Sequence, residues 1–268
     1  MHFKIDVRLD PTLGCGQAHR WRKQPDDSWQ GVIGKDVLTL YQTPDGFDCE
    51  GCTDMAAVRS YFRAEDNLPA IIREISVADP QIAALSAACP GLRLLRQPEW
   101  ECLATYVLAT NVNVKRIAKM VESVCDHFGT DLGARRAFPT PRQILDGGSC
   151  IGECRLGFRE GRFMELAQRI DSGDFNIRSP ERLPYEELTA RLQDLKGVGP
   201  KVADCVALFG YGRLEAFPVD VRIADEMKKR YGVTGNYQKI AAAGRERFGR
   251  YAGYAQEFLY HSGSIGAQ

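Results

Sequence analysis

The stretch Leu195–Cys205, LKGVGPKVADC, predicts two short helices joined by a glycine turn. Apolar residues recur at helical spacing on both sides of the turn: Leu188, Leu192 and Leu195 before it, and Val202, Val206 and Phe209 after it. Pro200 suits the first turn of a helix, where its missing N–H costs no hydrogen bond. Gly197 and Gly199 permit backbone angles that other residues resist. Residues 187–210 or so are therefore predicted to form a helix–GVG–helix hairpin.

This hairpin has two readings. It can be an ordinary turn between packed helices. Alternatively, unpaired N–H groups at the start of the second helix can bind an anion such as a DNA phosphate. Lys201 favours a specific function, because a positive charge in the first helical turn is electrostatically unfavourable. An amine placed there reaches its neutral, nucleophilic form more easily than a lysine on a solvated surface.

A carboxylate follows at a similar position of the next predicted helix. Asp220 ends the segment PVD and precedes an apolar-periodic stretch, so it is a natural N-cap. A carboxylate held at a helix start is also oriented, and it can stabilise a developing sugar cation or help to move protons. The two roles are compatible.

Composition narrows the class of protein only in part. The 268 residues carry 35 Lys+Arg and 35 Asp+Glu, which neither supports nor excludes a polyanionic partner. A basic start followed by an apolar leader is absent, and no run approaches the roughly 18 apolar residues of a spanning helix. We expect an intracellular protein, cytoplasmic or nucleoid-associated if bacterial, without membrane attachment and monomeric.

Nine cysteines are scattered along the chain, and in an intracellular protein we expect them to be reduced and mostly buried. Two pairs are closely spaced, Cys49 with Cys52 and Cys150 with Cys154. A shared zinc site would require both pairs to converge, and the chain has few histidines and no zinc-ribbon spacing. No cysteine follows Cys205, which disfavours an iron–sulfur cluster after the hairpin. We predict no metal site.

Periodicity along the chain predicts an α+β fold. Near-alternating apolar residues predict strands over 3–9, 29–43 and 46–51. Helical patterns follow over 54–65, 68–91, 100–129 with a break at Thr110–Asn113, 140–145, 161–174, 184–195, 200–210, 221–232 and 251–263. We predict an N-terminal antiparallel sheet domain with flanking helices, residues 1–95, packed on a helical domain, residues 96–268.

Six segments in order resemble the helix–hairpin–helix superfamily of DNA base-excision glycosylases, and within it the 8-oxoguanine DNA glycosylases of the eukaryotic type. They are LGCGQAHRWR, LRLLRQPEWECLATYVLATNVNVKRIAKMVESVC, LGFRE, GVGPKVADC, PVDVR and YAGYAQEFLY. The resemblance runs along nearly the whole chain. It implies a sheet domain packed on a helical hairpin domain and, as partner, double-stranded DNA containing oxidised guanine.

The resemblance also implies roles at the reacting base. Lys201 would attack the anomeric carbon of the sugar and form a Schiff base, with Asp220 assisting. The backbone carbonyl of Gly16 would accept from the N–H that 8-oxoguanine carries on its imidazole ring and guanine lacks. Cys205 and Tyr260 would sandwich the extruded base. Gln256 would form a hydrogen bond with it, and Phe209 would line the pocket.

Other residues would manage the opposite strand and the backbone. By resemblance, Asn111 would fill the hole left by the extruded base, Arg116 and Arg159 would bond the orphan cytosine, and Phe158 would wedge beside it. Gly197, Gly199 and Arg222 complete the expected DNA-binding set.

Four positions depart from the family pattern. His19 stands in place of Phe, Val112 in place of the middle Asn of a triple-Asn loop, Arg222 in place of His and Phe209 in place of Met. These departures bear on base entry and on strictness for cytosine opposite the lesion more than on the chemistry.

Three functions are compatible with these features. The first is a bifunctional glycosylase and β-elimination lyase acting through Lys201. The second is a monofunctional alkylbase glycosylase that activates water with Asp220, although such enzymes lack the lysine. The third is a non-catalytic DNA-binding module. The first chemistry requires no cofactor, while the hairpin carbonyls could hold a monovalent cation when DNA is bound.

Overall fold

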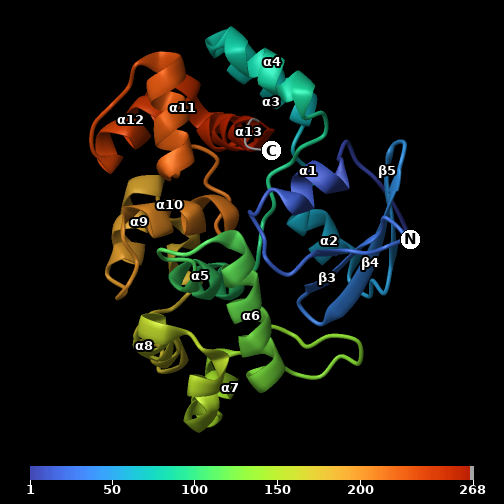
Figure 1. Ribbon diagram of the computed structural model, residues 1–268, viewed down its shortest axis with the longest axis vertical. Coiled ribbons are helices and arrows are strands. Elements are labelled where there is room, and N and C mark those ends of the chain that lie inside the picture. Colours follow the sequence, from blue (N-terminus) through green and yellow to red (C-terminus); the bar gives the residue numbers. More distant parts are fainter. Residues whose placement is uncertain (266–268) are drawn as a thin grey trace.

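A computed structural model describes residues 1–265. Its N-terminal part is a five-stranded antiparallel sheet with the strand order β1-β5-β4-β3-β2 (Figure 1). The strands are β1 (His2–Lys4), β2 (Arg22–Lys23), β3 (Trp29–Ile33), β4 (Asp36–Thr43) and β5 (Gly46–Glu50). The α+β prediction is thus confirmed. No helix within the described residues is long and apolar enough to cross a membrane.

The alternating pattern explains the central strands. Leu38 and Leu40 of β4 are fully buried, and Leu40 pairs with Trp29 of the neighbouring strand β3. Gly34 takes a φ of +59° in the tight turn that joins these two strands, a conformation that glycine adopts without steric cost. The single apolar stretch over 29–43 therefore folds as a hairpin.

The strand predicted over residues 3–9 is wrong beyond Lys4. The chain leaves the sheet there and forms a short helix, α1 (Leu9–Gly14). Proline at position 11 is compatible with this helix because it lies within the first turn. The loop that follows α1 carries Gly16 toward the helical part of the molecule.

Most of the remaining described residues are helical. The helices are α2 (Met55–Tyr61), α3 (Leu68–Ala78), α4 (Pro80–Ala88), α5 (Glu99–Leu108), α6 (Val114–Phe128), α7 (Pro141–Asp146), α8 (Glu160–Asp171), α9 (Tyr185–Gln193), α10 (Pro200–Phe209), α11 (Val221–Tyr231), α12 (Tyr237–Phe248) and α13 (Ala252–Ile265). The predicted break between α5 and α6 and the hairpin α9–α10 are confirmed. The sequence pattern did not predict α12.

Helices α3 and α4 pack with the helical core, although they precede residue 95. Ile71, Ile75 and Ile82 belong to the same buried cluster as residues of α10 and α13. Figure 1 shows both helices beside α13 and away from the sheet. The sheet has its own buried cluster with α1 and α2. A boundary at residue 95 stays a prediction, since the two cores interleave along the chain.

Polar side chains join the sheet part to the helices. Gln17 Nε2 donates to the carbonyls of Thr12 (2.9 Å) and Arg93 (2.8 Å), and its Oε1 accepts from the N–H of Leu95 (2.8 Å). Gln97 Nε2 in turn donates to the carbonyl of Gln17 at 2.7 Å. These bonds fix the loop after α1 against the segment that enters α5.

Candidate active site

The glycine turn of the hairpin leaves the N-terminal end of α10 exposed to solvent. Gly197 has a φ of +88°, in the left-handed region that favours glycine. Gly199 is the N-cap of α10 and provides no side-chain hydrogen bond to its first turn. The N–H groups of that turn are therefore without a side-chain cap, as an anion site requires.

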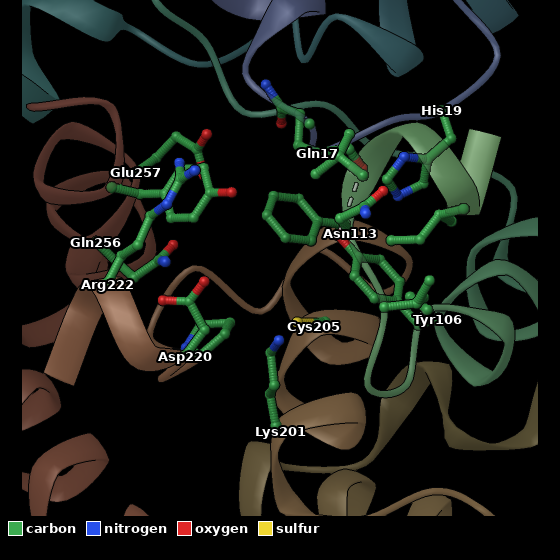
Figure 2. Close-up of a pocket in the computed structure, with 18 residues that line it drawn as sticks. Gln17, His19, Tyr106, Asn113, Lys201, Cys205, Asp220, Arg222, Gln256 and Glu257 are labelled. Atoms are coloured by element: carbon green, nitrogen blue, oxygen red, sulfur yellow. Dashed lines mark hydrogen bonds between the residues drawn. The ribbon is translucent and has the colours of Figure 1, made fainter. Parts of the chain in front are cut away.

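Lys201 lies in this first turn with an exposed side chain. It lines two neighbouring cavities, of about 290 Å³ and about 370 Å³. The first cavity is the candidate base pocket, and the second also includes Gly197 and Gly199 of the hairpin. Figure 2 shows the amine pointing into the space between Asp220 and Tyr106.

Asp220 caps a helix and also faces the pocket, and its catalytic role stays a prediction. Its Oδ1 accepts from the N–H of Ile223 at 2.9 Å, which makes it the N-cap of α11. Its side chain also lines the base pocket. The cap fixes the carboxylate in orientation, facing the cavity that receives the Lys201 amine (Figure 2).

Helix α13 supplies one wall of the pocket, and its first residues contact the C-terminal end of α10. Gly253 permits this contact: an added Cβ would lie 2.4 Å from Cδ1 of the buried Leu208. The approach places Gln256 and Tyr260 on the wall that faces α10. The pocket thus brings together eight predicted residues: Gly16, Lys201, Cys205, Phe209, Asp220, Arg222, Gln256 and Tyr260.

The opposite wall comes from the loop after α1 and from α5. His19 and Gln17 line it, and the ring of Tyr106 stacks on Phe209 with centroids 5.9 Å apart. Gly16 takes a φ of +96°, the left-handed region that favours glycine. Figure 2 shows this wall facing Gln256 and Glu257 across the cavity.

Burial dominates the electrostatics of the pocket. It raises the pKa of the Cys205 thiol to about 12, despite the favourable charge of Lys201, and it lowers the pKa of His19 to about 4. Burial, with a smaller contribution from the Asp220 charge, raises the pKa of Glu257 to about 7. The imidazole is therefore neutral at pH 7, whereas the Glu257 carboxyl titrates there.

The residues expected to manage the opposite strand lie outside the base pocket. Asn111 has a φ of +53° in the loop between α5 and α6. Arg159 is buried, and its Nε donates to the carbonyl of Thr110 at 3.0 Å. Arg116 Nη2 donates to the carbonyl of Arg155 at 2.9 Å.

Phe158 is the exposed aromatic of this region. It is 58% exposed, and the guanidinium carbons of Arg159 and Arg162 lie 4.2 Å and 5.5 Å from its ring centroid. In this structure Arg159 therefore supports the loop and flanks Phe158 rather than pointing freely outward. Its expected contact with cytosine stays a prediction.

Several residues that line the pocket were not predicted from the sequence, among them Tyr106, Gln17 and Glu257. Tyr106 lies within the predicted helical segment 100–129, and Gln17 lies inside the quoted motif LGCGQAHRWR, but neither received a role. Glu257 is buried and lines the same wall as Gln256. A signal for it existed, since it is the one acidic residue in the apolar segment Tyr254–Tyr260.

Comparisons with known proteins agree with this geometry. The family model described as "8-oxoguanine DNA glycosylase, N-terminal domain" matches residues 3–103. The N-glycosylase/DNA lyase OGG1 of Arabidopsis thaliana is 30% identical over 289 residues, covering 95% of this chain and 77% of that protein.

Solved structures give the same picture. The Clostridium acetobutylicum 8-oxoguanine glycosylase/lyase, in complex with double-stranded DNA containing cytosine opposite 8-oxoG, superposes with a TM-score of 0.93 at 26% identity, covering 98% of this chain and 93% of that one. The 3-methyladenine DNA glycosylase of Archaeoglobus fulgidus has a TM-score of 0.80 at 19% identity, covering 100% and 98%. This second similarity concerns the fold alone.

Proposed function

The chain belongs to the 8-oxoguanine DNA glycosylase family, and we propose that it excises 8-oxoguanine opposite cytosine from double-stranded DNA and then cleaves the strand by β-elimination. One observation carries the proposal. The amine of Lys201 and the capped carboxylate of Asp220 face one cavity from two different helices. A DNA-binding module requires only the hairpin and does not explain this convergence.

The first step is a displacement at the sugar. The neutral Lys201 amine attacks the anomeric carbon, the bond between this carbon and the base breaks, and the base leaves with the bonding electrons and takes up a proton. The Asp220 carboxylate stabilises the positive charge that develops on the sugar. Opening of the sugar ring then gives the Schiff base between Lys201 and the anomeric carbon.

The second step cleaves the strand. The iminium acidifies the adjacent C2′ position, a proton leaves it, and the C3′–O bond breaks with the phosphate as leaving group. The strand is nicked 3′ to the lesion, and water releases Lys201 from the sugar. A glycosylase that activated water with Asp220 would not require the exposed amine in the pocket.

The base would be read by groups on both walls. The Gly16 carbonyl accepts from the N–H that distinguishes 8-oxoguanine from guanine, and an unmet buried polar group costs about 1–3 kcal/mol. Cys205 and Tyr260 would lie on the two faces of the base, and Phe209 at its side. Gln256 is 6% exposed and its Oε1 has no partner among the described residues, so it is available for the Watson–Crick edge.

The DNA itself would lie across the hairpin and the loop between α5 and α6. The uncapped N–H groups after Gly197 and Gly199 would bind a phosphate. Arg222, whose guanidinium lies over the ring of Tyr260 at the base pocket, would contact the DNA there. Asn111 would enter the stack, and Arg116 with Arg159 and Phe158 would contact the opposite strand. This placement follows the second cavity, which extends from Lys201 to Asn111.

The proposed chemistry requires no resident metal or organic cofactor. Within residues 1–265, no group of three or more His, Cys, Asp or Glu side chains could hold a metal ion. Backbone carbonyls are suitable ligands for a monovalent cation, which we expect at the hairpin only when DNA is bound. Action on DNA implies an intracellular site of work.

A single-turnover assay tests the proposal. Labelled duplex with 8-oxoguanine opposite cytosine is incubated with excess protein, and base release and nicking are measured separately. Lys201→Gln should lose both by at least about 1,000-fold, because the covalent route is lost. Lys196→Gln is the matched control: Lys196 lies in the same hairpin, 65% exposed and 2.7 Å from Glu165, and should stay within about twofold of wild type. Base release that persists in Lys201→Gln would overturn the proposal.

A further inference from the structure

The base pocket contains polar atoms that nothing in the described protein satisfies. His19 Nδ1, Gln256 Oε1 and Glu257 Oε1 are all buried, line the same cavity and have no hydrogen-bond partner among the described residues. Such atoms are costly unless a ligand meets them. Gln256 already has a role in the proposed function, whereas Glu257 has none.

Glu257 lies well inside this pocket. The residue is 3% exposed and follows Gln256 on α13, and both side chains line the pocket across from Lys201 (Figure 2). The thiol of Cys15, at the C-terminal end of α1, interacts with the carboxyl and donates to the Thr12 carbonyl at 3.3 Å. No cation among the described residues forms an ion pair with Glu257 or is among the groups that act on its pKa.

We propose that Glu257 is a second base-reading residue, which in its neutral form donates a hydrogen bond from its carboxyl to a carbonyl oxygen of the extruded oxidised purine. This inference rests on the proposed function. A buried carboxyl without a cation beside it favours the protonated form. The hydrogen bond with Cys15 opposes this effect, and the charge of Asp220 reinforces it. The neutral acid has one O–H donor, whereas the carboxylate has none.

The chemistry of the pocket and of the base favours a donor. The Gly16 carbonyl, Gln256 Oε1 and the Asp220 carboxylate already supply acceptors. An 8-oxoguanine base has two carbonyl oxygens, one more than guanine, and both require donors when the base is removed from water. A neutral Glu257 supplies such a donor without adding a positive charge to the pocket that contains Lys201.

The consequence is that base binding depends on pH. The ionisable groups that line the same pocket are Cys205 and Lys201 of α10, Asp220 and Arg222 of α11, Tyr260 of α13, Tyr106 of α5 and His19 of the loop after α1, with Cys15 beside Glu257. No ionisable residue of the packed helices α3, α4 or α12 lines it within the described chain. Replacing Lys201 by Gln removes the nucleophile, so that base binding is measured without the reaction.

The experiment is therefore a binding titration in a Lys201→Gln background. Fluorescence anisotropy gives the ratio of Kd values for undamaged and 8-oxoguanine duplexes at pH 6 and pH 8.5. The ratio should fall by about tenfold at the higher pH, because ionisation removes one donor from a buried contact. Adding Glu257→Gln should keep the ratio high at both pH values, since the amide donates and does not titrate. Adding Glu257→Ala should give a low, pH-independent ratio.

A matched control separates this effect from general titration. Glu101 is another carboxyl whose pKa burial raises to about 7, but it is half-buried and does not line the base pocket. Glu101→Gln should leave the pH dependence unchanged. Thermal melts of each variant establish that it is folded.

Several outcomes would overturn the inference. One is a Lys201→Gln/Glu257→Gln protein whose Kd ratio depends on pH as it does in Lys201→Gln alone. Another is a Glu257→Ala protein that keeps the Kd ratio of Lys201→Gln at pH 6. The third is tighter lesion binding at pH 8.5 than at pH 6. Failure of the proposed function looks different: no variant would then prefer the lesion, and the wild type would release no 8-oxoguanine.

Discussion

Glu122 holds the sheet part of the molecule onto α6, and neutralising it should destabilise the protein strongly. Its carboxylate lies 2.6 Å from Arg135 Nη2, 3.0 Å from Arg22 Nη2 and 3.5 Å from Arg20 Nε. The side chains of Arg20 and Arg135 are only 4% and 5% exposed. Removing the anion from a buried ion pair leaves an uncompensated charge, which costs about 3–5 kcal/mol.

The change to make is Glu122→Gln, which keeps the shape and one acceptor oxygen. We expect the free energy of unfolding to fall by about 3 kcal/mol, at the lower end of that range because the amide oxygen still accepts from one arginine. At 2–4 °C per kcal/mol, Tm should fall by roughly 6–12 °C. Arg20 adjoins His19 in the pocket wall, so the KM for lesion DNA should also rise.

Urea unfolding followed by circular dichroism measures this loss. Glu165→Gln is the control, since Glu165 pairs with Lys196 at 2.7 Å but both side chains are well exposed, 40% and 65%. An exposed pair contributes at most about 1 kcal/mol. A Glu122→Gln protein within about 0.5 kcal/mol of wild type at unchanged m-value would refute this reasoning.

Three further predictions concern the pocket walls. His19→Phe should raise the free energy of unfolding by about 1 kcal/mol at pH 7, because it removes a buried unsatisfied nitrogen. The difference should grow as pH falls from about 6.5 toward 4, where wild-type His19, with its lowered pKa of about 4, resists the protonation that the unfolded chain accepts. Denaturation at pH 7 and pH 5 checks both. The free energy of unfolding of Glu257→Gln should rise by up to about 3 kcal/mol relative to that of the wild type between pH 4.5 and pH 8. The reason is that the pKa of Glu257 is raised to about 7, so wild-type stability falls over this range. The same pH dependence of the free energy of unfolding in both proteins, measured by urea denaturation, would contradict this. Gly253→Ala should lower the free energy of unfolding by about 1–3 kcal/mol, since its Cβ would lie 2.4 Å from Leu208 Cδ1. It should also lower kcat/KM by displacing α13. Unchanged stability and activity would contradict this prediction.

Local pattern was sufficient for most of the fold. The hairpin α9–α10 was predictable because apolar spacing, Pro200 and the glycines agree. Helix α12 was missed because its segment YQKIAAAGRERF is rich in alanine and charge and contains a glycine, so it has no pronounced apolar stripe. The residues 5–8 alternate like a strand, yet they leave the sheet because the chain must turn there into α1.

The site was predictable where a residue's role follows from its own helix. Lys201 and Asp220 were found because each occupies the first turn or cap of a helix. Glu257 and Tyr106 were not, since their roles depend on the approach of α13 and α5 to α10, which a single sequence does not reveal. Arg159 shows the same limit: its guanidinium bonds a carbonyl 49 residues away, a contact that no local pattern indicates.

Borohydride trapping tests the central claim most directly. The protein is incubated with duplex containing 8-oxoguanine opposite cytosine, sodium borohydride is added, and the covalent product is located by peptide mass spectrometry. We predict an adduct on Lys201 in the wild type and in Lys196→Gln, and none in Lys201→Gln. Free base released without any adduct, or an adduct on a different amine, would contradict the account.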